Sequence, residues 1–142
     1  MINNILVICI GNICRSPIAE GLMKRAWPDK TVVSAGIGAM VGHPAAPFSI
    51  ELALEHGVDI NAHRAQALTA KMVSDAELIL TMDLEQKRHL ELKYPTARGK
   101  VFRLGASDIA DPYRQDMAVF RHTYSLLAHS VDALVARVAH ID

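Results

Sequence analysis

The sequence predicts an α/β fold in three layers, a four-stranded parallel sheet with helices on both faces. Short apolar runs alternate along the 142 residues with longer segments of helical periodicity, an order that is typical of doubly wound sheets. The run at residues 5–8 contains only Ile, Leu and Val, as expected for a parallel strand buried on both faces. The length of the chain fits a single domain, residues 1–142, with a hydrophobic core of its own.

Four short apolar segments are the predicted strands, at residues 5–8, 31–34, 78–82 and 101–104. The third resembles the first in being almost entirely apolar, which again indicates burial on both faces. The second is expected to stop before Ala35 and Gly36, and the fourth is the weakest of the set. Because strands alternate with helices, all four are expected to run parallel.

The predicted helices occupy residues 17–27, 47–56, 69–73, 83–94 and 117–139. Pro28 ends the first helix, Gly57 closes the second, and Asp83 caps the fourth, which stops before Pro95. In the last segment, apolar residues recur mostly every three or four positions, which predicts a long amphipathic helix.

Composition excludes several classes of protein. Lys plus Arg equals Asp plus Glu at 15 each, a balance that gives no indication of nucleic-acid binding. No apolar run approaches the roughly 18 residues of a membrane span, and no basic signal-peptide region opens the chain, so a cytoplasmic location is expected. The two cysteines are too few for a disulfide scaffold, and the seven histidines show no metal-binding spacing.

The segment Cys-Ile-Gly-Asn-Ile-Cys-Arg-Ser, residues 9–16, lies between the first strand and the first helix. Backbone N–H groups in such a turn, together with the helix N-terminus, form a site for an anion. The planar guanidinium of Arg15 can hold two oxygens of a phosphate. The same positive field stabilises a thiolate at Cys9, which is therefore the predicted nucleophile for a phosphate ester, giving a phosphocysteine.

Individual residues of this loop have their own predicted roles. The predicted phosphate-binding residues are Ile10, Gly11, Asn12, Ile13, Cys14, Arg15 and Ser16. Gly11 can take a positive φ at little cost, and Asn12 can hold the loop through side-chain hydrogen bonds to the backbone and adopt a left-handed conformation. Ser16 is expected to cap the helix and also to reach the Cys9 sulfur. Cys14 is either a small buried residue or a resolving thiol that forms a reversible disulfide with Cys9.

Asp111-Pro112-Tyr113 is the second candidate site. Asp-Pro commonly starts a solvated turn. A carboxylic acid held rigid by a following proline can also serve as a proton donor to a leaving oxygen. The residues alone leave both interpretations open.

Taken together, these segments resemble the low-molecular-weight protein tyrosine phosphatases. Within that family they most resemble the bacterial enzymes paired with tyrosine autokinases of capsule and exopolysaccharide export. The resemblance is carried by Asn4-Ile5-Leu6-Val7 leading into residues 9–16, by Ser34-Ala35-Gly36, by Ile79-Leu80-Thr81-Met82 and by Asp111-Pro112-Tyr113.

The resemblance implies a fold, a chemistry and a partner. It implies metal-free and cofactor-free hydrolysis of phosphotyrosine, with Cys9, Arg15 and Asp111 as catalytic residues and Asp111 as general acid and then base. It also implies that Tyr113 and Met40 form walls of the substrate pocket, to which Ile13 adds the floor or side; the alternative for Met40 is packing in the core. The implied partner is a phosphotyrosine protein, the C-terminal tail of a membrane tyrosine autokinase.

Two alternatives remain at this stage. A thioredoxin-linked arsenate reductase shares the loop and fold but needs two more cysteines after the third strand, and residues 70–100 contain none. A non-catalytic module that binds phosphotyrosine or senses redox state would be indicated by loss of Cys9, Arg15 or Asp111, and all three are present.

Overall fold

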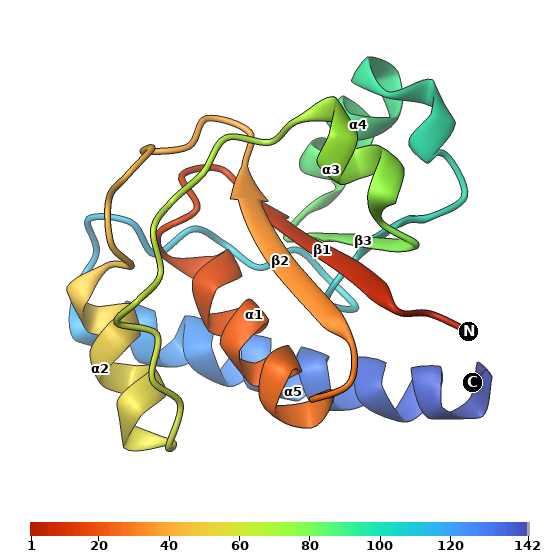
Figure 1. The fold of residues 1–142 in the computed structure, drawn as a ribbon. Helices are drawn as coiled ribbons and strands as arrows, with labels where there is room; N and C mark the ends of the chain where they lie inside the picture. Colours follow the sequence, from red (N-terminus) through yellow and green to blue (C-terminus); the bar gives the residue numbers. More distant parts are fainter. Residues whose placement is uncertain (142) are drawn as a thin grey trace.

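The computed structural model describes residues 1–141 and contains one four-stranded sheet in the order β2-β1-β3-β4 (Figure 1). The strands are β1 (Asn4–Cys9), β2 (Thr31–Gly36), β3 (Leu78–Thr81) and β4 (Val101–Arg103). Every pair of neighbouring strands is parallel, so their carboxyl ends meet at one edge of the sheet. The predicted parallel α/β architecture is confirmed.

Helices cover both faces of this sheet. They are α1 (Arg15–Ala26), α2 (Pro47–Glu55), α3 (Ala70–Asp75), α4 (Leu84–Lys93) and α5 (Met117–Ile141), with a short 3₁₀ turn, η1 (Pro95–Ala97). Figure 1 shows α1, α2 and α5 on one side of the sheet and α3 and α4 on the other. Within residues 1–141, no helix is long and apolar enough to cross a bilayer.

The buried residues form two clusters, one on each face of the sheet. Side chains of β1 alternate between them: Ile5 and Val7 join the cluster beneath α1 and α5, whereas Leu6 and Ile8 join the one beneath α3 and α4. Successive side chains of a strand point to opposite faces. A strand that supplies both clusters must therefore be apolar at every position, which explains the continuous run at residues 5–8.

The end of β2 differs from the sequence-based expectation. The second strand does not stop before Ala35 but continues to Gly36, which pairs with Cys9. A Cβ at Gly36 would lie 2.5 Å from the carbonyl oxygen of Ile10, so the glycine permits close approach of the backbone after β1 rather than ending the strand.

The first helix begins at Arg15, earlier than expected, and its N-cap is Cys14 without a capping side chain. The prediction that Ser16 caps this helix is therefore wrong, because Ser16 lies inside the first turn with its hydroxyl engaged by neighbouring side chains. Pro17 still lies in the first turn, where a missing N–H costs little. The predicted cap of α4 is confirmed, since the Asp83 carboxylate accepts from the Gln86 amide at 2.7 Å.

Two adjacent leucines of α5 test the packing of this helix. Leu127 has no exposed surface, whereas Leu126 is 38% exposed. We expect Leu127→Ala to lower the free energy of unfolding by about 2–5 kcal/mol, because it removes buried methyl groups and leaves a cavity. Leu126→Ala should change it by about 0.5 kcal/mol or less. Urea unfolding of both variants measures the difference, and equal effects would contradict the described orientation of α5.

Candidate active site

A cavity of about 220 Å³ opens at the carboxyl edge of the sheet, where β1 passes through residues 10–14 into α1. Its lining residues are Cys9, Ile10, Gly11, Ile13, Cys14, Gly38, Met40, Asp111 and Tyr113. The structure thus brings together the two segments that the sequence marked as chemical, residues 9–16 and 111–113, although about 100 positions separate them.

The backbone carbonyls of the loop turn away from its interior. Those of residues 9–14 each accept a hydrogen bond from a segment outside the loop: from the amides of Ile37, Gly38, Met40 and Ala46, from the imidazole of His63 and from the hydroxyl of Ser49. In a trans peptide the N–H points opposite to the C=O, and none of the described peptides is cis. The loop amides therefore face inward, as an anion site requires.

Asn12 is the residue that allows this curvature. Its φ is +59°, in the left-handed region, which asparagine tolerates better than most residues. Gly11 does not use its freedom to take a positive φ, whereas the left-handed conformation considered for Asn12 is confirmed. The Asn12 side chain is fully buried, and its oxygen Oδ1 accepts from the Gln66 amide at 2.9 Å.

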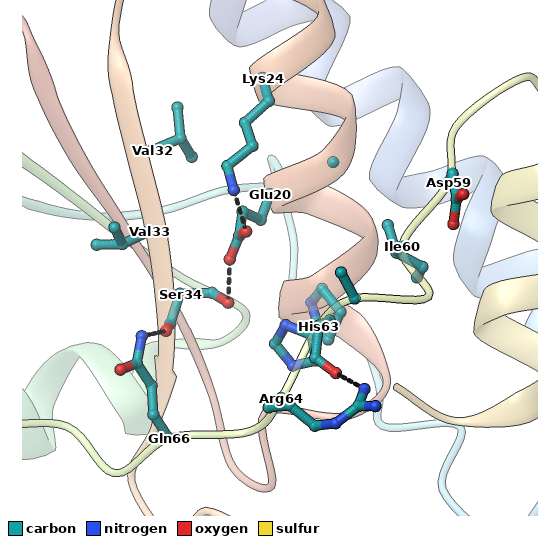
Figure 2. A pocket seen from close by; sticks show the side chains of 13 residues that line it. Glu20, Lys24, Val32, Val33, Ser34, Asp59, Ile60, His63, Arg64 and Gln66 are labelled. Carbon is teal, nitrogen blue, oxygen red and sulfur yellow. Dashed lines mark hydrogen bonds and ion pairs between the residues drawn. The ribbon is translucent and has the colours of Figure 1, made fainter. Parts of the chain in front are cut away.

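Asn12 is also held by residues on neighbouring elements. Its Nδ2 donates to the hydroxyls of Ser16 at 2.8 Å and Ser34 at 3.0 Å. Nε2 of His63 donates to the carbonyl of Asn12 over 2.7 Å. Figure 2 shows His63, Ser34 and Gln66 together beside α1 and β2. No role was predicted for His63, because no spacing along the sequence connects it with Asn12, a residue 51 positions away.

Cys9 ends β1 and is 2% exposed. Its sulfur lies 2.9 Å from the hydroxyl oxygen of Ser16, as the sequence analysis expected. A hydroxyl that donates to sulfur stabilises the thiolate over the thiol. The contact therefore places a thiolate-stabilising group beside the predicted nucleophile.

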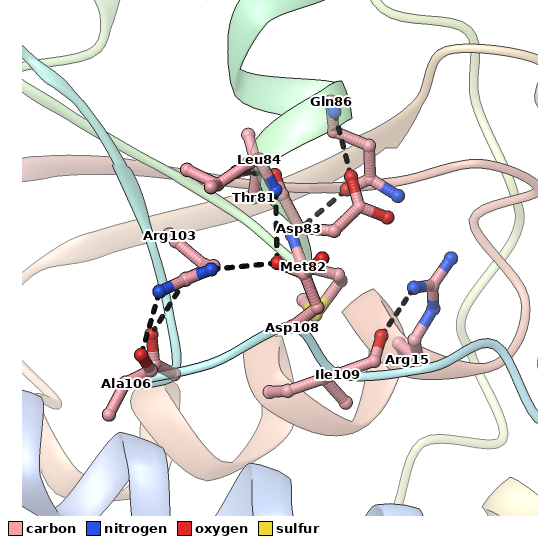
Figure 3. Close-up of polar contacts among 11 residues, drawn as sticks. Arg15, Thr81, Met82, Asp83, Leu84, Gln86, Arg103, Ala106, Asp108 and Ile109 are labelled. Carbon is pink, nitrogen blue, oxygen red and sulfur yellow. Dashed lines mark hydrogen bonds and ion pairs between the residues drawn. The ribbon is translucent and has the colours of Figure 1, made fainter.

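Arg15 joins the loop to the segment that carries Asp111. Its guanidinium is buried, and Nη1 donates to the carbonyl of Ile109 at 2.8 Å (Figure 3). Nη2 lies 3.6 Å from the Asp111 carboxylate, and Nε has no hydrogen-bond partner among the described residues. A buried N–H without a partner is costly, so this donor is available to an oxygen of a bound anion.

Asp111 forms a turn, as the first interpretation of the Asp-Pro-Tyr segment expects, and it also lines the cavity, as a proton donor would have to. Its Oδ1 accepts from the Tyr113 amide at 3.1 Å, which makes a local turn, while its other oxygen faces Arg15. The segment is tied to the sheet because the Ile109 amide donates to the carbonyl of Met82. The carboxyl group is thus held at the cavity and remains 41% exposed, so water can reach it.

The remaining walls of the cavity are mainly apolar. Ile13 is buried and Met40 is partly buried, and Met40 both lines the cavity and packs against the larger buried cluster. Tyr113 is 39% exposed, with the guanidinium of Arg114 over its ring at 5.2 Å from the centroid. In the part of the chain that the structure describes, no group of three or more His, Cys, Asp or Glu could hold a metal ion.

Cys14 lies in the same loop but in a different environment. It is 3% exposed, and its thiol, like that of Cys9, is free. Burial, together with the nearby Asp111 and Cys9, raises the pKa of Cys14 from 9.0 to about 12. Cys14 is therefore a protonated thiol at neutral pH. Its disulfide with Cys9 remains a prediction.

Comparison with known proteins gives a consistent result. Residues 4–141 match the family model described as low molecular weight phosphotyrosine protein phosphatase. The chain is 49% identical over 141 residues to the probable low molecular weight protein-tyrosine-phosphatase EpsP of Ralstonia nicotianae, covering 97% of both proteins. It is 44% identical over 137 residues to the low molecular weight protein-tyrosine-phosphatase Wzb of Escherichia coli K12, covering 92% of this chain and 91% of that one.

A solved structure shows the same fold. Wzb of Vibrio vulnificus in complex with benzylphosphonate superimposes with a TM-score of 0.93 at 41% identity, over 96% of this chain and 99% of that chain.

The pKa of Cys14 predicts how stability depends on pH. Folding raises this pKa above the unfolded value of 9.0. The contribution of the Cys14 thiol to the free energy of unfolding is therefore fully present below pH 9 and is lost as the pH rises toward 12. We expect the stability advantage of the wild type over Cys14→Ala to fall above pH 9, by at most about 1.4 kcal/mol per pH unit. Urea unfolding of both proteins under reducing conditions at pH 8 and pH 10.5 measures it. A constant difference would contradict the burial of this thiol.

Proposed function

The chain belongs to the low molecular weight phosphotyrosine protein phosphatase family, whose members use a phosphocysteine mechanism, and we propose that Cys9 is its nucleophile, Arg15 its phosphate clamp and Asp111 its general acid and base. The observation that carries this proposal is the loop itself: its carbonyls are all engaged outside, its amides face inward, and the Cys9 sulfur lies at the same cavity.

In the first step, the thiolate of Cys9 attacks the phosphorus of a phosphotyrosine. An S–P bond forms while the P–O bond to the tyrosine breaks. The loop amides and the unpartnered Nε of Arg15 hold the equatorial oxygens, where charge stabilisation contributes most to phosphoryl transfer. Asp111 in its protonated form gives its proton to the departing phenolate oxygen.

In the second step, the phosphocysteine is hydrolysed. Asp111, now a carboxylate, takes a proton from a water molecule, which attacks the phosphorus. The S–P bond breaks, inorganic phosphate leaves and the thiolate of Cys9 is restored. The hydroxyl of Ser16, 2.9 Å from the sulfur, stabilises this leaving thiolate.

The cavity favours an aromatic phosphate ester. Ile13, Met40 and Tyr113 surround the space next to Cys9 with apolar and aromatic surface, which suits a phenyl ring. We propose a phosphotyrosine protein as substrate, specifically the tail of a membrane tyrosine autokinase of exopolysaccharide or capsule export, with the enzyme in the cytoplasm. The likeness to the bacterial enzymes of that group supports this partner.

The first test is substrate selectivity without metal. We expect the reduced wild type to hydrolyse phosphotyrosine peptides and not phosphoserine peptides, because the shorter phosphoserine does not carry its phosphate past the apolar walls to Cys9. Cys9→Ser should abolish turnover, since a serine hydroxyl in this site lacks the nucleophilicity of the thiolate. Steady-state release of phosphate measures both. Wild-type rates in Cys9→Ser would disprove the phosphocysteine, and no turnover by the wild type would favour a binding module.

A second test concerns the proton donor. We expect Asp111→Asn to lower kcat about 10²- to 10⁴-fold with little change in KM, since it removes general acid catalysis and retains the size of the side chain. Asp116→Asn is the matched control. Asp116 lies directly before α5 and accepts from the Val119 amide, a contact that asparagine also makes. The kcat of Asp116→Asn should therefore equal that of the wild type. Equal kcat values for both variants would rule out Asp111 as the acid.

A further inference from the structure

A chain of hydrogen bonds connects the carboxylate of Glu20, in the middle of α1, with the sulfur of Cys9. Its links are Glu20 to Ser34 at 2.5 Å, Ser34 to Asn12 at 3.0 Å, Asn12 to Ser16 at 2.8 Å and Ser16 to Cys9 at 2.9 Å. Figure 2 shows the first link, at the edge of a cavity of about 340 Å³ that lies outside the catalytic one. Glu20 does not line the catalytic cavity.

The direction of each hydrogen bond in this chain follows from Asn12. Its Oδ1 accepts from the Gln66 amide, so the NH₂ end of the side chain must face the two serines. That end has two hydrogens and no lone pair to offer, and it donates one to Ser16 and one to Ser34. Each serine hydroxyl accepts from Asn12 and must therefore donate its own hydrogen to a different acceptor. For Ser16 that acceptor is the Cys9 sulfur.

The hydrogen of Ser34 goes to Glu20, because an ionised carboxylate only accepts. Ser34 is 1% exposed, and a buried hydroxyl without an acceptor is costly. If the carboxylate is removed, the amide oxygen of Asn12 can serve as acceptor once the side chain has flipped. The flipped oxygen also attracts the hydrogen of Ser16 away from Cys9, and the Gln66 amide loses its acceptor.

We infer that Glu20 is a positioning residue: by accepting from Ser34 it keeps Asn12 oriented so that Ser16 donates to the sulfur of Cys9. The inference rests on the proposed role of Cys9 as nucleophile. Removal of the acceptor should leave the thiolate without its hydroxyl donor, so that a higher pH is needed to form it.

Other charges near the two ends of the chain must be separated from this effect. Lys24 of α1 pairs with Glu20 at 2.7 Å, and Asp59, His63 and Arg64 line the same outer cavity, to which β2 contributes no charged side chain. At the other end, Asp111 and Cys14 line the same cavity as Cys9, and Arg15 lies 3.6 Å from the Asp111 carboxylate. Every Glu20 variant loses the ion pair with Lys24, so the effect of losing that pair needs its own control.

The test is the pH dependence of Cys9 alkylation by iodoacetamide, with the modified cysteine located by mass spectrometry. In Glu20→Met, which has a similar length and no acceptor, we expect the pH midpoint to rise by about one unit, as for loss of a hydrogen bond to a charged group. Glu20→Gln retains an acceptor oxygen and should shift it far less. Lys24→Met removes the ion pair but not the acceptor, and should match the wild type.

The interpretation depends on Ser34 as the intermediary. In a Ser34→Ala protein the Gln66 amide still donates to Oδ1 of Asn12 and no Ser34 hydrogen remains to favour the flip, so the midpoint should stay near that of the wild type. Adding Glu20→Met to Ser34→Ala should then produce no shift, because Glu20 acts only through Ser34. An unchanged midpoint in Glu20→Met, a shift as large in Lys24→Met, or a raised midpoint in the double variant would overturn the inference. If thermal unfolding shows that Glu20→Met does not fold, an unchanged midpoint in Glu20→Ala, which also lacks the acceptor, overturns it.

Alkylation reads the sulfur directly and does not require turnover. A wild type that alkylates at Cys9 but hydrolyses no phosphotyrosine would contradict the proposed function, whereas the alkylation midpoints would still decide whether Glu20 acts on the Cys9 sulfur. If the wild type hydrolyses phosphotyrosine but the pH midpoint of Cys9 alkylation is the same in Glu20→Met, only the inference about Glu20 is contradicted.

Discussion

The left-handed conformation of Asn12 is the constraint on which the site depends. It costs about 1–2 kcal/mol for a residue with a side chain, and it persists because Asn12 is buried and hydrogen-bonded to Ser16, Ser34, Gln66 and His63. Each such bond contributes about 0.5–1.5 kcal/mol, and each group left unpaired would cost more. The loop can therefore turn its carbonyls outward and its amides inward before any ligand arrives.

The parallel sheet supplies the partners for this loop. Its strands end at a common edge, so the segment after β2 and the segment after β4 both reach residues 9–15. Gly38 and Met40 donate to loop carbonyls from one side, while Arg15 reaches the carbonyl of Ile109 from the other. Preorganisation of this kind stabilises developing charge without reorganisation during the reaction. The position of the site thus follows from topology, as is general for open α/β sheets.

The same loop places two cysteines in different surroundings. Cys9 has the hydroxyl of Ser16 at its sulfur, whereas burial and negative neighbours keep Cys14 protonated. Arg15 adds a second asymmetry, because two of its nitrogens are engaged by Ile109 and Asp111 while Nε has no described partner. Departures from full hydrogen bonding in a folded protein are expected at functional sites. Here the unpaired donor belongs to the proposed phosphate clamp.

The sequence by itself determined the alternation of strands and helices, the apolar character of β1, the amphipathic α5 and the spacing of Cys9 and Arg15, because these are local patterns with a period or a fixed separation. It could not choose between Gly11 and Asn12 for the left-handed position, and it misplaced Ser16 as a cap. The conformation of Asn12 depends on hydrogen bonds to residues 22 to 54 positions away, and the hydroxyl of Ser16 is engaged by Asn12 and Cys9. Contacts over such separations leave no periodic signal along the chain. Only the tertiary structure therefore revealed His63, Gln66 and Glu20 as supports of the loop.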